Sequence, residues 1–152
     1  MSAQAILTMS GNVVQIAGYP GQFLKKWRSY TLSLVRTATA SAIFSGSIQI
    51  DPNAAPFLCV GLHADDTADT NTITTLEDWL VNAQDNQNGY TWCDGYVSRL
   101  SLFGGREFGL NFPDEFALKS NTRISINVQN KATSPTAGTA TLVLRGWQLI
   151  AI

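Results

Sequence analysis

A strict alternation of apolar and polar residues over residues 123–129 constrains the fold more than any other feature of this sequence. The apolar members are Ile124, Ile126 and Val128, and a polar residue follows each of them. A repeat of two places apolar side chains on one face of an extended chain, whereas a helix requires a repeat of 3.6 residues. Residues 123–129 are therefore predicted to form a half-buried β-strand.

The same extended pattern recurs along most of the chain. Tyr30, Leu32 and Leu34 fall on one side of an extended segment, and Ile48 and Ile50 do so shortly before a turn. Short strands between clusters of Gly, Pro, Asn and Asp are typical of a sandwich. We therefore expect an all-β fold, namely a two-sheet antiparallel β-sandwich of jelly-roll type with at least seven strands. Further strands are predicted at residues 12–16, 42–46, 57–62, 89–92, 97–103 and 139–150.

One short helix is predicted in a connection between strands. Thr74 and Glu77 match a capping box, in which the two side chains satisfy free amides at the start of a helix. The apolar residues that follow have helical spacing, which favours one buried stripe over two turns. They are Leu76, Trp79, Leu80 and Ala83.

The chain is expected to form one sandwich over residues 29–152, preceded by a different segment. A chain of 152 residues has the common size of a single domain. Residues 1–28 mix Ala, Gly and short apolar pieces with a turn at Tyr19-Pro20-Gly21. We expect this segment to be either an N-terminal arm, whose apolar residues need a surface outside the chain, or a first strand of the sandwich.

Charge is scarce and its sign is segregated along the chain. Charged residues make up 14% of the sequence, against about 25% in an average soluble protein. Residues 1–36 carry no acid, and residues 37–98 carry no Lys or Arg. Complementary surfaces on neighbouring subunits would use this pattern, although charges in solvated loops produce it as well. The predicted partner-binding residues are Lys25, Lys26, Trp27 and Arg28 on one subunit and Asp65, Asp66 and Asp69 on the next.

No catalytic or metal-binding signature stands out. His63 is the single histidine, and the acidic loop that follows it matches neither an EF-hand nor the usual zinc spacings, so we expect no metal and no cofactor. Cys59 and Cys93 lack a nucleophile signature and are expected to be reduced and buried rather than linked or reactive. An enzyme is therefore not expected. The acidic segment argues against nucleic acid, and no apolar run is long enough for a membrane span.

Aromatic side chains offer an alternative function. Flat apolar rings stack on sugar rings in carbohydrate-binding β-sandwiches, although Trp and Tyr more commonly fill a core and its rim. The aromatic residues concerned are Trp27, Tyr90, Trp92, Tyr96 and Trp147.

Several short motifs occur from residue 41 onward, at residues 44–48, 55–57, 100–106, 112–113, 119–124 and 143–147. The order of these features resembles small β-sandwich virion proteins of tailed bacteriophages that decorate or cement the capsid. The resemblance implies a structural protein on the capsid surface of the virion, made in the host cytoplasm. Its implied partners are the capsid protein and copies of itself, with a trimer favoured. The alternative is a carbohydrate- or receptor-binding module of a phage fibre or tail.

Overall fold

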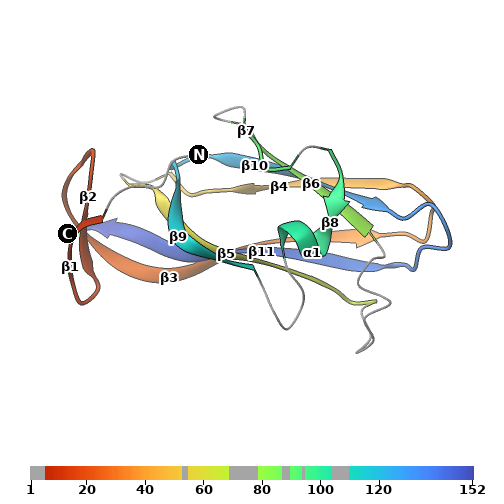
Figure 1. The fold of residues 1–152 in the computed structure, drawn as a ribbon, viewed down its shortest axis with the longest axis horizontal. Coiled ribbons are helices and arrows are strands. Elements are labelled where there is room, and N and C mark those ends of the chain that lie inside the picture. Colours follow the sequence, from red (N-terminus) through yellow and green to blue (C-terminus); the bar gives the residue numbers. More distant parts are fainter. Residues whose placement is uncertain (1–5, 53–54, 69–78, 87–89, 94, 104–109) are drawn as a thin grey trace.

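A computed structural model of the chain describes residues 6–52, 55–68, 79–86, 90–93, 95–103 and 110–152. Within these residues the chain forms eleven strands and a single helical turn. The strands build two sheets, and every strand pair is antiparallel (Figure 1). The predicted all-β fold with two antiparallel sheets is confirmed.

Sheet A has six strands in the order β1-β2-β3-β11-β5-β9. The strands are β1 (Ile6–Ser10), β2 (Val13–Ile16), β3 (Tyr19–Arg36), β5 (Phe57–Asp66), β9 (Leu110–Leu118) and β11 (Gly138–Ala151). Sheet B has the order β4-β10-β6-β7, and β8 also pairs with β6. Its strands are β4 (Ile43–Gln49), β6 (Trp79–Asp85), β7 (Tyr90–Thr91), β8 (Val97–Ser98) and β10 (Arg123–Asn130). The helical turn α1 (Arg99–Leu102) follows β8 directly.

The alternation at residues 123–129 produces β10 as predicted. Ile124, Ile126 and Val128 are completely buried, while the residues between them are less buried or exposed. β10 lies between β4 and β6, so both of its edges are paired. The apolar face of β10 therefore contributes to the main core between the two sheets.

The predicted helix is wrong wherever the structure describes it. Trp79, Val81 and Ala83 are fully buried along β6, and the residues between them are more exposed. The burial repeat is thus two, because β6 pairs with β10 along its whole length and turns one face to the core. Thr74, Leu76 and Glu77 lie outside the described residues.

The strand predicted at residues 97–103 is correct only for its first two residues. From Arg99 the chain forms α1, and the Phe103 amide donates to the Arg99 carbonyl at 2.7 Å. Residues four apart lie on the same side of a helical turn. Arg99 and Phe103 are both buried, so the turn directs both side chains inward. An extended chain would also place both side chains on one side, but they would lie farther apart.

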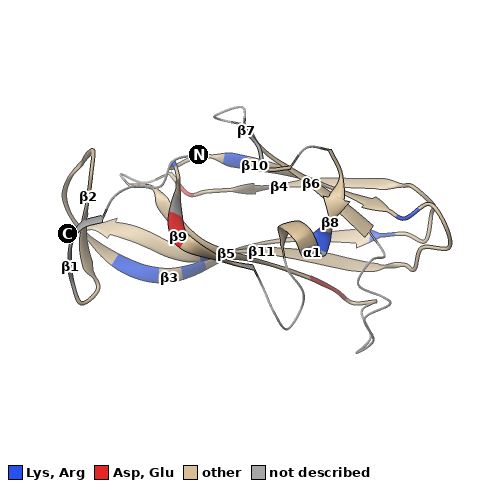
Figure 2. Ribbon diagram, in the orientation of Figure 1, with Lys and Arg blue, Asp and Glu red and all other residues tan. Residues whose placement is uncertain are grey.

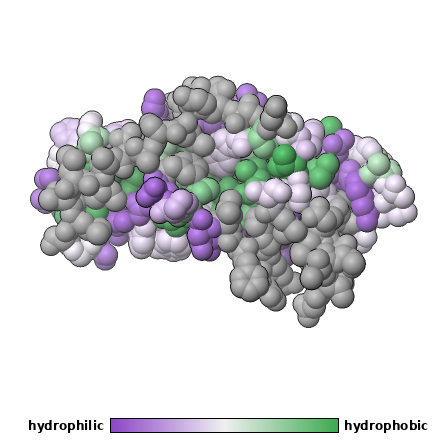
Figure 3. All heavy atoms as spheres, viewed as in Figure 1, coloured by the Kyte–Doolittle hydropathy of each residue, from purple (hydrophilic) through white to green (hydrophobic). Residues whose placement is uncertain are grey.

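The main core lies between the two sheets. Figure 3 shows that hydrophobic residues visible from this side gather between the layers near β8. Sheet A contributes Tyr30, Phe57, Cys59, Leu62, Ala64, Leu118, Ala140, Leu142 and Leu144, and sheet B contributes Ile48, Trp79, Val81, Ala83, Ile124, Ile126 and Val128.

A long two-stranded ribbon joins this core to a second, smaller one. β3 and β11 pair without interruption from Arg36 opposite Gly138 to Phe23 opposite Ala151. The ribbon extends toward the β1–β2 hairpin, where the second core forms (Figure 1). Its buried members are Val14, Ile16, Phe23, Ala55, Leu58 and Leu149.

The first 28 residues are largely part of sheet A in the described structure. They form β1, β2 and the first half of β3, which runs through residue 28 without a break. Val14 and Ile16 are buried within the chain itself. The expectation that these apolar residues need a surface outside the chain is therefore wrong for these two. A role of the segment in attachment stays a prediction.

Gly146 lies at a β-bulge and at a close approach of the neighbouring strand. The pairing of β11 with β5 shifts by one residue between Arg145 and Gly146, which is a β-bulge. A Cβ atom at Gly146 would lie 2.0 Å from the carbonyl oxygen of Leu58. Because that oxygen belongs to the neighbouring backbone, only glycine fits there.

Candidate functional site

The basic segment predicted from the sequence lies on β3, in the half of the strand that extends toward the β1–β2 hairpin. Successive side chains of a strand point to opposite faces of the sheet. Lys25 and Trp27 therefore share one face, and Lys26 and Arg28 share the other. The segment is thus divided between two surfaces.

Lys25 and Trp27 belong to a cluster that we call the outer aromatic face, made up of Lys25, Trp27, Glu115, Arg145 and Trp147. Trp27 lies opposite Trp147 in the β3–β11 pairing, and the two rings meet edge to face with centroids 4.9 Å apart. Half of the Trp27 surface, 50%, remains open to solvent. The Lys25 ammonium lies 4.8 Å from the centre of the Trp147 ring.

An ion pair between Lys25 and Glu115 shows that sheet A curls over this face. Lys25 Nζ lies 3.1 Å from Glu115 Oε1, although β11 and β5 separate their strands in the sheet. In a flat sheet the two strands would lie about 14 Å apart, from a spacing of about 4.8 Å per strand. Figure 2 shows the acidic part of β9 beside the basic part of β3.

Arg145 completes the outer aromatic face and lies diagonally from Trp27. Its Nη2 donates to Asn111 Oδ1 at 2.9 Å. Two atoms on this face are buried and have no hydrogen-bond partner among the described residues, namely Arg145 Nε and Glu115 Oε2. One is a donor and the other an acceptor, so the face has unused capacity for both kinds of hydrogen bond.

The opposite side of the same ribbon carries exposed apolar residues. Leu24 lies directly opposite Ile150, and the Ile152 amide donates to the Gln22 carbonyl at 3.1 Å. Leu24 and Ile150 are 41% and 40% exposed, and Ile152 is 75% exposed. We call this surface, with the exposed Lys26 beside it, the apolar extension face.

Arg28 lies at the junction between the extension and the main core. It pairs with Asp51, and its guanidinium lies 4.4 Å from the centre of the Tyr30 ring. The Tyr30 hydroxyl accepts a hydrogen bond from the Asp51 amide at 3.1 Å. Burial raises the pKa of the Tyr30 phenol above its ordinary value. These contacts close the end of the main core, so Arg28 has a partner within its own chain.

The three predicted acidic partners have different environments. Asp65 is half-buried, and its Oδ1 accepts a hydrogen bond from the Asp66 amide at 2.8 Å. Asp66 is 3% exposed and forms an ion pair inside the chain. It is therefore not accessible to a basic segment on a neighbouring subunit. Asp69 lies outside the described residues.

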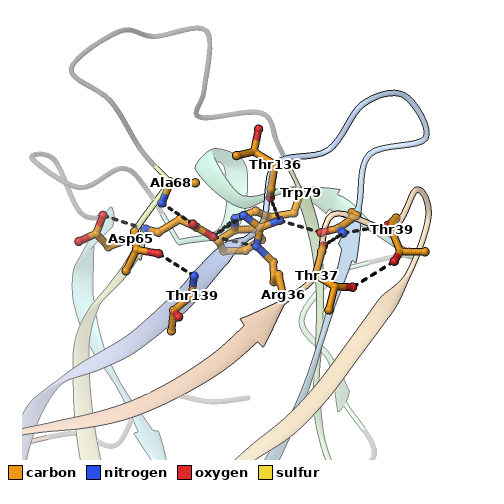
Figure 4. Close-up of polar contacts among 11 residues, drawn as sticks. Arg36, Thr37, Thr39, Asp65, Ala68, Trp79, Thr136 and Thr139 are labelled. Atoms are coloured by element: carbon orange, nitrogen blue, oxygen red, sulfur yellow. Dashed lines mark hydrogen bonds and ion pairs between the residues drawn. The ribbon is translucent and has the colours of Figure 1, made fainter.

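Asp66 belongs to a buried polar network at the end of the sandwich away from the second core (Figure 4). Its Oδ2 lies 2.7 Å from Arg36 Nη2 and accepts a bond from Trp79 Nε1 at 2.9 Å. Arg36 Nη1 donates to Asn130 Oδ1 at 2.7 Å. A Cβ atom at Gly138 would lie 2.2 Å from Asp66 Oδ1, so the network also depends on that glycine. The network links β3 and β5 of sheet A to β6 and β10 of sheet B.

No catalytic group emerges from the described residues. Burial raises the pKa of the Cys59 thiol to about 12, so it is not a ready nucleophile at neutral pH. Both cysteines are free, with Cys59 buried and Cys93 half-buried. No group of three or more His, Cys, Asp or Glu in the described part of the chain is placed to hold a metal ion.

A shallow hollow of about 440 Å³ lies on the outer side of sheet B, lined by Gln49, Asn86, Asn121 and Arg123. Gln49 donates to the Asn121 carbonyl at 2.7 Å, and Arg123 donates to Gln49 at 3.1 Å. None of the four is a carboxylate, a histidine or a cysteine. The hollow therefore lacks the usual groups for acid–base or nucleophilic catalysis.

Of the five aromatic residues singled out in the sequence, the structure brings Trp27 and Trp147 together. Trp92 packs against the main core instead, and Tyr96 is half-buried in the segment just before β8. The side chain of Tyr90 lies outside the described structure. Sequence reasoning missed Glu115, Arg145, Leu24, Ile150 and Ile152, because their places depend on strand pairing between distant segments.

Comparisons of the chain with models of protein families, with curated proteins and with solved structures give no match. Among the described residues, no helix is long and apolar enough to span a bilayer.

Proposed function

We propose that the chain is a structural virion protein, specifically a capsid decoration or cement protein of a tailed bacteriophage. The strand order supports a jelly roll, the finer form of the sandwich. From β3 onward the sheets have the orders β3-β11-β5-β9 and β4-β10-β6-β7, which fit an eight-stranded double Greek key. Jelly rolls of this kind build viral capsid proteins and lectins.

The apolar extension face is the observation that carries this proposal. Leu24, Ile150 and Ile152 form an apolar surface at one end of the molecule. Protein interfaces are poor in charge at their centres, and the three residues that form this surface are uncharged. Its proposed partner is the capsid protein, with further contacts between copies of the chain in a trimer.

Binding to virus particles tests the proposal. Leu24→Glu combined with Ile150→Glu places two charges on the apolar extension face and should lower co-sedimentation with undecorated capsids at least tenfold. Val35→Glu is the matched control, because Val35 is 74% exposed on the same strand but lies in the half nearest Arg36. Equal binding of both variants, with wild-type circular dichroism spectra, would reject the proposal.

A second candidate function is a carbohydrate- or receptor-binding module of a phage fibre or tail. The half-exposed Trp27 beside Trp147 favours it, because such rings stack on sugars. Antibody labelling of intact particles in the electron microscope separates the candidates. Label on the head supports decoration, and label on the tail supports the second candidate.

A further inference from the structure

We propose that the outer aromatic face binds a neutral saccharide, with the sugar ring stacked on Trp27 and its hydroxyls bonded to Glu115 and Arg145. The inference deepens the second candidate function but does not depend on where the protein sits in a particle. The apolar extension face, on the opposite side of the ribbon, remains free for a protein partner.

The outer aromatic face exposes a large aromatic side chain. Half of the Trp27 surface, 50%, is exposed to water, and the Trp147 ring contacts the Trp27 ring edge to face. Indole rings contribute a large apolar area at low entropic cost because they have only two side-chain torsions. The apolar C–H face of a pyranose is a ligand surface of matching shape.

Two buried atoms of the outer aromatic face have unused hydrogen-bonding capacity. Glu115 Oε2 needs a donor and Arg145 Nε needs an acceptor, and neither has one among the described residues. Leaving such buried atoms unsatisfied carries a desolvation penalty. A sugar hydroxyl both donates and accepts, so a saccharide can supply a partner for each kind of atom.

The charges on the outer aromatic face favour a neutral ligand. Lys25 is neutralised by Glu115 at 3.1 Å, and Arg145 bonds the neutral amide of Asn111. A free carboxylate on the ligand would approach Arg145 but would also be repelled by the unsatisfied oxygen of Glu115. The pairing of one unsatisfied donor with one unsatisfied anionic acceptor therefore favours hydroxyls over an acidic sugar.

The outer aromatic face is already assembled in the unbound chain. The cation–π contact between Lys25 and Trp147 and the ion pair to Glu115 fix three side chains from three strands. Trp27 is supported by the long β3–β11 ladder. Groups that are held in place before binding lose little freedom on binding, which raises affinity.

The experiment is a titration with defined oligosaccharides, followed by protein NMR shifts and tryptophan fluorescence. The neutral probes are maltohexaose, cellohexaose and β-1,4-galactotetraose, and the acidic probes are sialyllactose and a galacturonate oligomer. We expect at least one neutral probe to bind and to shift the indole signal of Trp27. Binding of acidic probes alone, or of no probe, would overturn the inference.

Variants then assign binding to this face. Trp27→Ala should weaken the binding of the neutral probe at least tenfold, and Trp27→Phe should retain part of it, which guards against a folding defect. Glu115→Gln should also weaken binding, because it replaces the open acceptor. Leu24→Glu is the matched control on the opposite face of β3 and should leave sugar binding unchanged. Unchanged affinity in Trp27→Ala would contradict the inference even if capsid binding is observed.

Discussion

The buried guanidinium of Arg36 joins the two sheets of the sandwich. Its guanidinium bonds Asp66 of sheet A and Asn130 of sheet B, and Asn130 in turn donates to the carbonyls of Thr37 and Thr39. A buried ion pair is weak evidence for stability as such, but removal of one partner leaves the other charge buried and unpaired. Asp66 is therefore a structural residue.

Arg36→Met should lower the free energy of unfolding by about 3–5 kcal/mol, measured by urea denaturation at neutral pH. Arg28→Met is the matched control, because the Arg28–Asp51 pair is partly exposed, and such a pair contributes about 0–1 kcal/mol. Similar losses in the two variants would show that the network around Arg36 does not hold the sheets together.

The buried thiol of Cys59 makes the free energy of unfolding decrease at alkaline pH. The pKa of its thiol is about 12 in the folded chain, against about 8.5 in an unfolded one. Between these values the unfolded state binds fewer protons, so stability falls as pH rises. The raised pKa of Tyr30 acts in the same direction. Cys59→Ala should therefore flatten the decline in unfolding free energy between pH 8.5 and pH 10, measured in urea. A parallel decline in wild type and variant would contradict this.

At the scale of the elements, the local repeat of two predicted β10 because one face of this strand is buried in the main core and the other face is more exposed. It failed at β6, where Trp79, Leu80 and Ala83 fit a helical repeat while Trp79, Val81 and Ala83 fit a strand. Pairing with β10 decided between the two. That pairing joins distant segments and leaves no local signal in the sequence.

The candidate site was predictable only in part, for the same reason. Trp27 and Trp147 each stood out in the sequence, but their contact depends on the register of β3 against β11. Glu115 reaches Lys25 only because sheet A curls. Asp66 looked like one of several loop acids, and nothing in its neighbourhood along the chain indicated that Arg36 would bury it.

Deletion of residues 2–24 tests how the first elements contribute. It removes Val14, Ile16 and Phe23 from the second core and leaves Leu58 and Leu149 without their cover. The main core keeps its members, so we expect a folded sandwich that melts at a lower temperature than the intact chain. Thermal circular dichroism measures this. An unfolded product would show that β1, β2 and the start of β3 are required for folding, and an unchanged melting temperature would show that the second core adds no stability.

At the scale of the whole molecule, the low charge leads us to expect self-association, with a trimer favoured. Sedimentation velocity over a range of concentrations should show a species of three chains. Leu24→Glu should leave this species in place, because the apolar extension face is assigned to the capsid protein. A monomer at every concentration would contradict the prediction.

The ribbon of β3 and β11 also determines where foreign sequence can be attached. Ile152 lies on the apolar extension face, whereas the connection from β10 to β11 lies at the other end of the ribbon (Figure 1). Foreign sequence attached after Ile152 would lie against the proposed docking surface. Ala132 and Thr133 are exposed and lie before Thr136, whose carbonyl accepts a hydrogen bond from Arg36. An insertion between Ala132 and Thr133 would instead display the foreign sequence away from both faces of the extension.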